Sequence, residues 1–186
     1  MTVLDIPVIF SDRKSVCVEI RRDGTPVIRA PKRMPTRQIE DFIRAHRSWI
    51  DTHISSVLEK KSKTDLIPAL SEAEKASLSV SAERVIPDRF TFFAERVGVT
   101  YGKLTLRFMK SKWGSCSANG DIRINTLLML APPFVLDAIV IHELCHRKQM
   151  NHSAAFYREV YRVCPDYDKA KAWLKENGAA ILARLS

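Results

Sequence analysis

The spacing of apolar residues predicts the first elements of the chain. Between residues 16 and 20 apolar side chains occupy every second position, Asp23-Gly24 follows, and a further apolar pair stands at 27–28. Period-two alternation around an Asp-Gly turn is typical of a β-hairpin. Over residues 36–58 apolar side chains recur at steps of three and four, which predicts one amphipathic helix of about six turns.

A second long helix is predicted by its start signal. Ser71 is followed three residues later by Glu74, a spacing in which each side chain can bond the other's free backbone N–H. We expect this helix to kink or restart at Pro87, which lacks an N–H donor, and to end near Gly98. The preceding residues 60–70 are polar and suit an exposed connection.

Beyond residue 100 the pattern returns to strands. Apolar residues alternate over 104–108 and over 122–124, and Asn119-Gly120 lies between the two runs. These features predict a second hairpin with a long loop.

Three helices are predicted after this hairpin. Pro132-Pro133 suits a helix start, and the residues from Phe134 to Met150 are apolar nearly all round, which predicts a core helix. Shorter helices are expected over 153–163 and over 167–177, the latter ended by Gly178.

These elements predict an α+β fold with two parts. Residues 1–64 would form a lobe of one hairpin and one long helix. Residues 65–186 would form a helical core with a small antiparallel sheet on one side, and we expect the two parts to make one compact structural unit.

Composition narrows the class of protein. The chain has 186 residues, 46% of them hydrophobic and 27% charged, which is ordinary globular composition. The longest apolar stretch, 126–141, is shorter than the roughly 18 residues of a membrane span and contains two prolines. No secretory signal is visible, and the four cysteines lack CxxC spacing, so we expect a reduced, cytoplasmic protein.

The charge balance bears on possible partners. The net charge of +9 is spread along the chain without a run of five Lys or Arg residues, and aromatic residues do not alternate with the basic ones. This distribution is not typical of a dedicated nucleic-acid module. It leaves open a weak nucleic-acid or nucleotide contact.

One stretch of the chain predicts a metal site. His142 and His146 flank Glu143 in an HExxH pattern, and five residues separate His146 from His152. Residues four apart on a helix are offset by about 40°, so the first two imidazoles point the same way. Glu143 would stand beside the ion without ligating it, and a turn after the helix would bring the third imidazole back.

Ligand chemistry favours zinc. Three neutral imidazoles with one open position suit a single catalytic Zn²⁺, whereas structural zinc usually takes four ligands rich in Cys. The alternative is a set of hydrogen-bonded core histidines, but it must explain three of the five histidines within eleven residues of an apolar helix. The other two, His46 and His53, have no carboxylate at a ligand offset, and we expect them to pack between helices.

The spacing of the three histidines equals that of metzincins. Two departures argue against that family, since Gln149 replaces the turn glycine and no Met follows Met150.

The chain instead resembles the YgjP-like zinc metallopeptidase domain family. The resemblance rests on the segments Lys112–Cys116, Ile122–Asn125, Ala131–Pro133, His142–His146, Asn151–Ser153 and Pro165–Tyr167. It implies a zincin-like fold, zinc at His142, His146 and His152, and Glu143 as the catalytic base.

The residues and the resemblance together predict a zinc metallopeptidase. A zinc-activated water would attack a peptide bond while Glu143 takes and later returns its proton. We expect a monomer that acts on a protein or peptide.

Further residues are candidates for contact with the substrate or the transition state. They are Trp113, Asn125, Tyr157 and Tyr161. Each has a structural alternative: a core anchor for Trp113, a turn cap for Asn125, and packing or surface roles for the tyrosines. Gly114 would serve a backbone turn, and Asp166 either fixes a ligand imidazole or caps a helix.

Two other functions remain open. The basic group formed by Lys110, Lys112 and Arg123 is compatible with a zinc-dependent hydrolase of nucleotide phosphoanhydrides, although no Gly-rich phosphate loop is present. The basic amino-terminal part is compatible with a DNA-associated protease, because SprT-like proteases also use HExxH and a later His.

Overall fold

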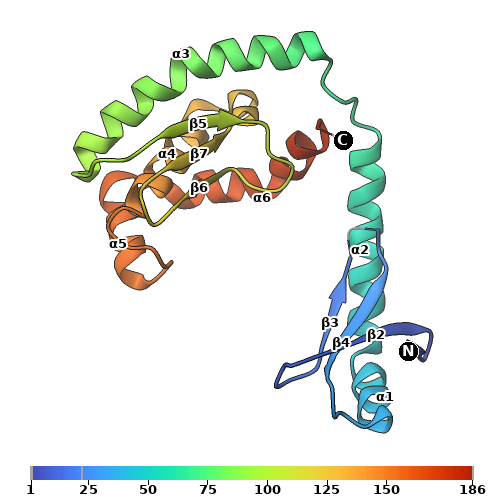
Figure 1. Ribbon diagram of the computed structural model, residues 1–186. Coiled ribbons are helices and arrows are strands. Elements are labelled where there is room, and N and C mark those ends of the chain that lie inside the picture. Colours follow the sequence, from blue (N-terminus) through green and yellow to red (C-terminus); the bar gives the residue numbers. More distant parts are fainter. Residues whose placement is uncertain (1, 22, 186) are drawn as a thin grey trace. The chain divides into compact units, whose positions relative to one another are not determined.

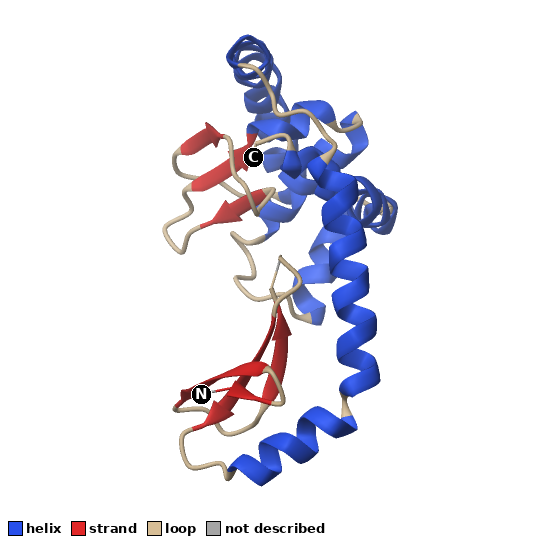
Figure 2. Cartoon of the chain, turned by 90° about the vertical axis from the view of Figure 1, so that its right-hand side faces the viewer, coloured by secondary structure: helices blue, strands red, loops and turns tan. Residues whose placement is uncertain are grey.

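The computed structural model describes residues 2–21 and 23–185. The chain divides into two compact units, residues 1–66 and 67–186, and each is described by itself. Strands and helices occur in both units (Figures 1 and 2), which confirms the α+β class. Among the described residues, no helix is both long and apolar enough to span a membrane.

The amino-terminal unit is a four-stranded sheet followed by two helices. Its elements are β1 (Thr2–Val3), β2 (Ile6–Ser11), β3 (Cys17–Ile20), β4 (Pro26–Pro31), α1 (Thr36–Ala45) and α2 (Arg47–Asp65). The sheet order is β1-β2-β4-β3. Residues Ile28, Ile39, Ile43 and Ile50 lie fully within its apolar core.

The predicted hairpin is confirmed, but it has a further partner. β3 pairs antiparallel with β4, with Val18 opposite Ile28. On the other side of β4, β2 runs parallel to it, with Val8 opposite Ile28. The sequence analysis missed β2.

The single helix predicted over 36–58 is wrong. The chain leaves helical geometry at His46, with φ −110° and ψ 9°, and α2 then extends to Asp65. The His46 ring stacks on Phe42 at 4.3 Å, and its Nδ1 lies 2.8 Å from the Phe42 carbonyl oxygen. His53 makes the same contact with the Trp49 carbonyl oxygen without a break in α2, so this bond does not explain the change of geometry at His46, and apolar spacing does not reveal it.

The prediction that His46 and His53 pack between helices is also wrong. Both side chains are exposed. His53 stacks on the exposed Trp49 with ring centroids 3.8 Å apart.

The second unit contains the helix that carries the HExxH pattern. Its elements are α3 (Glu72–Val97), β5 (Leu104–Arg107), β6 (Gly114–Cys116), β7 (Ile122–Asn125), the 3-10 helix η1 (Thr126–Leu130), α4 (Pro133–Cys145), α5 (Ala154–Val163) and α6 (Tyr167–Ala183). α4 contacts α3, α5, α6 and β6, so it lies at the centre of the unit. Its apolar side chains join those of the sheet and the other helices in one core cluster.

The capping signals in the sequence predicted the start and the end of α3 correctly. Ser71 Oγ accepts from the backbone N–H of Glu74 at 3.2 Å, and the Ser71 N–H donates to the Glu74 carboxylate at 2.8 Å. The helix ends at Gly98, whose φ of 78° suits glycine. It continues through Pro87 as one element, so the predicted restart there does not occur.

The predicted second hairpin is wrong. β5 and β7 pair in parallel, with Leu106 opposite Ile124, and β6 pairs antiparallel with the other side of β7. The sheet is therefore mixed, in the order β5-β7-β6. β6 reads Gly-Ser-Cys and has no apolar alternation that would predict a strand.

Two helix ends also differ from the prediction. α4 ends at Cys145 and not near Met150. α6 continues past Gly178 to Ala183. A Cβ atom at Gly178 would lie 3.0 Å from Trp113 Cζ2, so this glycine allows the indole to approach α6 and does not end the helix.

Candidate metal centre

The end of α4 presents two of the histidines. His142 lies in the last turn, and His146 is the C-cap with φ −62° and ψ −19°, so the helical offset between them is preserved. His152 comes from the segment that joins α4 to α5. Ser153 directly follows it and caps α5 by accepting from the Phe156 N–H at 3.4 Å.

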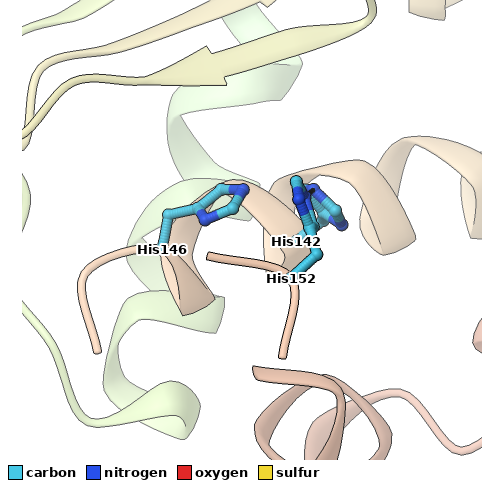
Figure 3. A group of neighbouring side chains, drawn as sticks. All are labelled: His142, His146 and His152. Carbon is cyan, nitrogen blue, oxygen red and sulfur yellow. Dashed lines mark hydrogen bonds between the residues drawn. The ribbon is translucent and has the colours of Figure 1, made fainter. Parts of the chain in front are cut away.

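The three imidazoles converge (Figure 3). His142 Nε2 and His152 Nε2 are 3.1 Å apart, and one ligand nitrogen from each of the three rings lies within 4.8 Å of the others. Two nitrogens at about 2.05 Å from a tetrahedral ion lie about 3.3 Å apart. The separation of His142 and His152 is close to this value, and His146 completes a three-histidine donor set.

Hydrogen bonds behind the rings orient two of the ligands. His142 Nδ1 lies 2.7 Å from the Tyr167 hydroxyl oxygen, and His146 Nδ1 lies 3.1 Å from the backbone oxygen of Gln149. When the proton of each ring is on Nδ1, that N–H donates to the Tyr167 hydroxyl or to the Gln149 carbonyl. The Nε2 atom of each ring is then unprotonated and can bind a metal ion.

Tyr167 was missed as a candidate site residue, although it stands in one of the segments that resemble the YgjP-like family. Its side chain is only 5% exposed, and burial raises the pKa of its hydroxyl. Asp166 occupies the N-cap position of α6 without a side-chain cap bond. The histidine partner is therefore Tyr167 and not Asp166.

The protein environment favours the neutral form of His142 and His146. Burial, followed by the neighbouring His146 and His152, lowers the pKa of His142 to about 3. Burial also lowers the pKa of His146. Neutral imidazole is the form that binds a metal ion.

Glu143 is enclosed beside the histidines. It is 5% exposed, and Oε2 has no hydrogen-bond partner in the described part of the chain. A Cβ at Gly114 would lie 2.5 Å from Glu143 Oε1, so β6 passes directly over this carboxylate. Burial raises the pKa of Glu143 to about 7, and nearby Lys112 opposes that shift.

Gly114 therefore has a role beyond the predicted backbone turn. The strand can approach Glu143 only because residue 114 has no side chain.

Asn125 is not available for substrate contact, contrary to the prediction. It is fully buried, and its Nδ2 donates to the backbone oxygens of Met109 and Lys112, both at 2.7 Å. Its Oδ1 accepts from the N–H groups of Met109 and Leu127. The amide is committed to holding the loop before β6.

Trp113 is half-buried and packs against the core and Gly178. This is the core-anchor alternative considered from the sequence.

Of the two predicted tyrosines, Tyr157 lies nearer the metal ligands. Its ring centroid is 6.3 Å from that of His152. Tyr161 is exposed and donates its hydroxyl to Asp168 Oδ1 at 2.9 Å.

Comparison with protein-family models identifies the family. The model of the family described as YgjP-like, metallopeptidase domain, matches residues 14–75 and 68–177. The UTP pyrophosphatase of Escherichia coli strain K12 is 34% identical over 67 residues, which are 34% of this chain and 40% of that protein.

Two solved metallopeptidase zymogens are similar at the level of structure. Pyrococcus abyssi abylysin has a TM-score of 0.45 and 23% identity, and Methanocaldococcus jannaschii jannalysin has a TM-score of 0.45 and 21% identity. Each covers 50% of this chain, which in turn covers 94% of abylysin and 95% of jannalysin. The family match spans most of the sequence, including all three histidines and Glu143, and the chain belongs to the YgjP-like metallopeptidase domain family.

Proposed function

We propose that this chain is a zinc-dependent peptidase in which His142, His146 and His152 hold the ion and Glu143 is the general base. The observation that carries the proposal is the convergence of three imidazoles beside a buried carboxylate. When bound, zinc supplies a Lewis acid that polarises a carbonyl and acidifies a water molecule.

Glu143 suits proton transfer because of its surroundings. The unpaired Oε2 is free to accept a proton, and β6 limits how far the side chain can move. A general base works best when its pKa lies near the working pH. A divalent cation beside the carboxylate would lower its pKa from about 7, because an opposite charge favours the ionised form.

Tyr157 is the tyrosine best placed to donate to the substrate. The Tyr167 and Tyr161 hydroxyls bond His142 and Asp168, whereas no bond of the Tyr157 hydroxyl occurs among the described residues. A donor to the developing oxyanion typically contributes 10²–10³-fold to kcat. We expect Tyr157→Phe to lower kcat by roughly 100-fold with little change in KM, and an unchanged kcat would remove this role.

Substitution of the base tests the proposal. Glu143→Gln should bind zinc normally, as measured by elemental analysis, and should cleave an unfolded protein pool at least about 100-fold more slowly. Undiminished cleavage by this variant would exclude Glu143 as the base, and lack of zinc in the natural protein would exclude the metal assignment.

A second candidate is hydrolysis of a nucleoside triphosphate. It is supported by the partial similarity to a UTP pyrophosphatase and by the exposed Lys110, Lys112 and Arg123. Pyrophosphate release from each of the four triphosphates, assayed with the zinc form, distinguishes the two activities. Turnover of a triphosphate without peptide cleavage would favour the second candidate.

The proposed compartment is the cytoplasm. All four cysteines are free, as expected in a reducing environment.

A further inference from the structure

The amino-terminal unit carries a concentration of positive charge that the hydrolase site does not use. We define the basic edge as residues 11–15 and 31–37, which contain five cationic side chains and one carboxylate. The cationic residues are Arg13, Lys14, Lys32, Arg33 and Arg37, and the acidic residue is Asp12. All of them except Arg13 are exposed.

The parallel pairing of β2 with β4 assembles this edge. Ser11 lies opposite Pro31 where both strands end, so the residues that follow each strand emerge side by side. The ion pair of Lys32 Nζ with Asp12 Oδ2, at 2.9 Å, joins the two segments. Without β2, which the sequence analysis missed, these charges would not appear to be neighbours.

Most of the other basic side chains that the structure describes in this unit form ion pairs with carboxylates. The ion pairs are Arg29–Glu19, Arg44–Glu40, Arg47–Asp51, Lys61–Asp65 and Lys63–Glu59. At the basic edge, by contrast, Lys14, Arg33 and Arg37 have no carboxylate partner among the described residues. The first turn of α1 contains no acidic side chain either. Uncompensated charge therefore gathers at one end of the sheet.

The chemistry of the basic edge fits a row of phosphates better than a protein surface. Arginine guanidinium groups pair with phosphate oxygens through two hydrogen bonds, and neutral groups such as Ser15 and Thr36 are typical additional phosphate contacts. A protein partner usually needs aromatic or other apolar anchors. No exposed large apolar side chain occurs at this edge in the described part of the unit.

We propose that the basic edge binds the phosphate backbone of a nucleic acid, without reading its sequence, through Lys14, Arg33 and Arg37. This binding is independent of the hydrolytic site in the second unit. The affinity should depend steeply on salt, because each neutralised phosphate releases condensed counterions.

Fluorescence anisotropy of the zinc-loaded full chain with a labelled 20-base-pair DNA duplex, at several salt concentrations, tests the proposal. The double substitution Arg33→Gln and Arg37→Gln removes two phosphate contacts. It should reduce the slope of log K against log salt by about 1.8, and should weaken binding by roughly 60-fold at about 0.1 M salt. Adding Lys14→Gln should reduce the slope by about a further 0.9.

A matched control removes the same charge elsewhere. Arg44→Gln with Arg47→Gln changes the net charge equally, but both residues are already paired on the helices, so the slope should stay close to that of the natural protein. All variants should show the circular dichroism and thermal unfolding of the natural chain, since the substituted side chains are exposed.

Three outcomes would overturn the proposal. They are absence of DNA binding by the natural protein, an equal loss of affinity in the control and the Arg33/Arg37 variant, and binding of polyglutamate in place of DNA. The last result would identify an acidic protein as the partner.

Discussion

The hydroxyl oxygen of Tyr167, the first residue of α6, lies 2.7 Å from Nδ1 of the proposed metal ligand His142, and Tyr167 is only 5% exposed. Metal-binding histidines commonly donate their second N–H to a carboxylate or a backbone carbonyl. Here the partner is a neutral phenol. It fixes the ring without adding negative charge, and in the described part of the chain no acidic side chain bonds this imidazole.

Tyr167→Phe should therefore weaken zinc binding while preserving the shape of the site. Loss of such an outer hydrogen bond typically costs about 10- to 100-fold in metal affinity. Competition with a chromogenic chelator measures the dissociation constant. Tyr161→Phe, which removes the same atom from an exposed ring, is the control and should bind zinc as the natural protein does. Equal affinities in all three proteins would contradict this role.

The pKa of Glu143 predicts how the metal-free protein responds to pH. The folded-state pKa of about 7 lies above the ordinary value of 4.5, so this group contributes stability below pH 4.5 that is lost as the pH rises through 7. Glutamine does not titrate. We expect the stability advantage of Glu143→Gln over the natural protein to grow between pH 4.5 and 8 by up to about 3 kcal/mol.

Urea unfolding at the two pH values, with a chelator present, measures this difference. His142 has the opposite dependence, because its lowered pKa makes the folded state less stable as the pH falls from 6.5 towards 3. Both proteins carry His142, so its contribution cancels in the comparison. A difference that does not change with pH would show that Glu143 ionises normally in the folded chain.

The candidate site was accessible to sequence analysis because its ligands lie within eleven residues. Helical geometry alone brings His142 and His146 together, and only His152 depends on the turn that follows. The supporting residues Tyr167 and Gly114 come from other elements. Apolar periodicity contains no information about the contacts between elements that place them at His142 and Glu143.

At the scale of elements, Gly178 shows how packing overrides a local signal. A glycine near the end of an apolar pattern normally predicts a helix end, yet α6 continues for another turn. The close approach of Trp113 explains why glycine occurs there.

Gly178→Ala tests this explanation, because helix propensity and packing change the free energy of unfolding in opposite directions. Alanine in place of glycine favours a helix by up to about 1 kcal/mol, whereas overpacking costs about 1–3 kcal/mol. We expect a net loss of about 1 kcal/mol in the free energy of unfolding. Adding Trp113→Phe should make the alanine less harmful, and a stabilising single substitution would show that the indole moves aside freely.

The prediction of helix ends was correct where residues close in sequence determine the local backbone conformation. The Ser71–Glu74 capping box, Gly98 and the proline start of α4 all act within one turn of the chain. The β3–β4 hairpin was predicted correctly. The parallel pairs β2–β4 and β5–β7 were missed because another strand stands between the two partners along the chain, so no local turn signals the pairing. The break at His46 lies within a stretch of helical apolar spacing, so this spacing gives no signal of it.

At the scale of the whole molecule, the family and the α+β fold class are confirmed. The histidine cluster belongs entirely to the second of the two units. A ligand that binds only the folded state stabilises the part of the protein that forms its site.

Zinc should consequently stabilise the second unit against unfolding more than the first. At about 100 times its dissociation constant, the ion should stabilise the second unit by about 2.7 kcal/mol. Hydrogen exchange read by mass spectrometry should slow in α4, α5 and α6, and should stay unchanged in residues 2–21 and 23–66. His152→Ala is the control and should largely remove the effect, whereas equal protection of both units would indicate that they unfold together.

The placement of the third histidine has a consequence for how quickly the ion is exchanged. His142 and His146 project from one rigid helix, but His152 is exposed and belongs to the short segment between α4 and α5. His142 and His146 would therefore meet an arriving cation first, and His152 would complete the ligand set. We expect release of the ion to require separation of His152 from the helical pair, so a deletion that shortens the segment 147–151 would change the residence time of the ion.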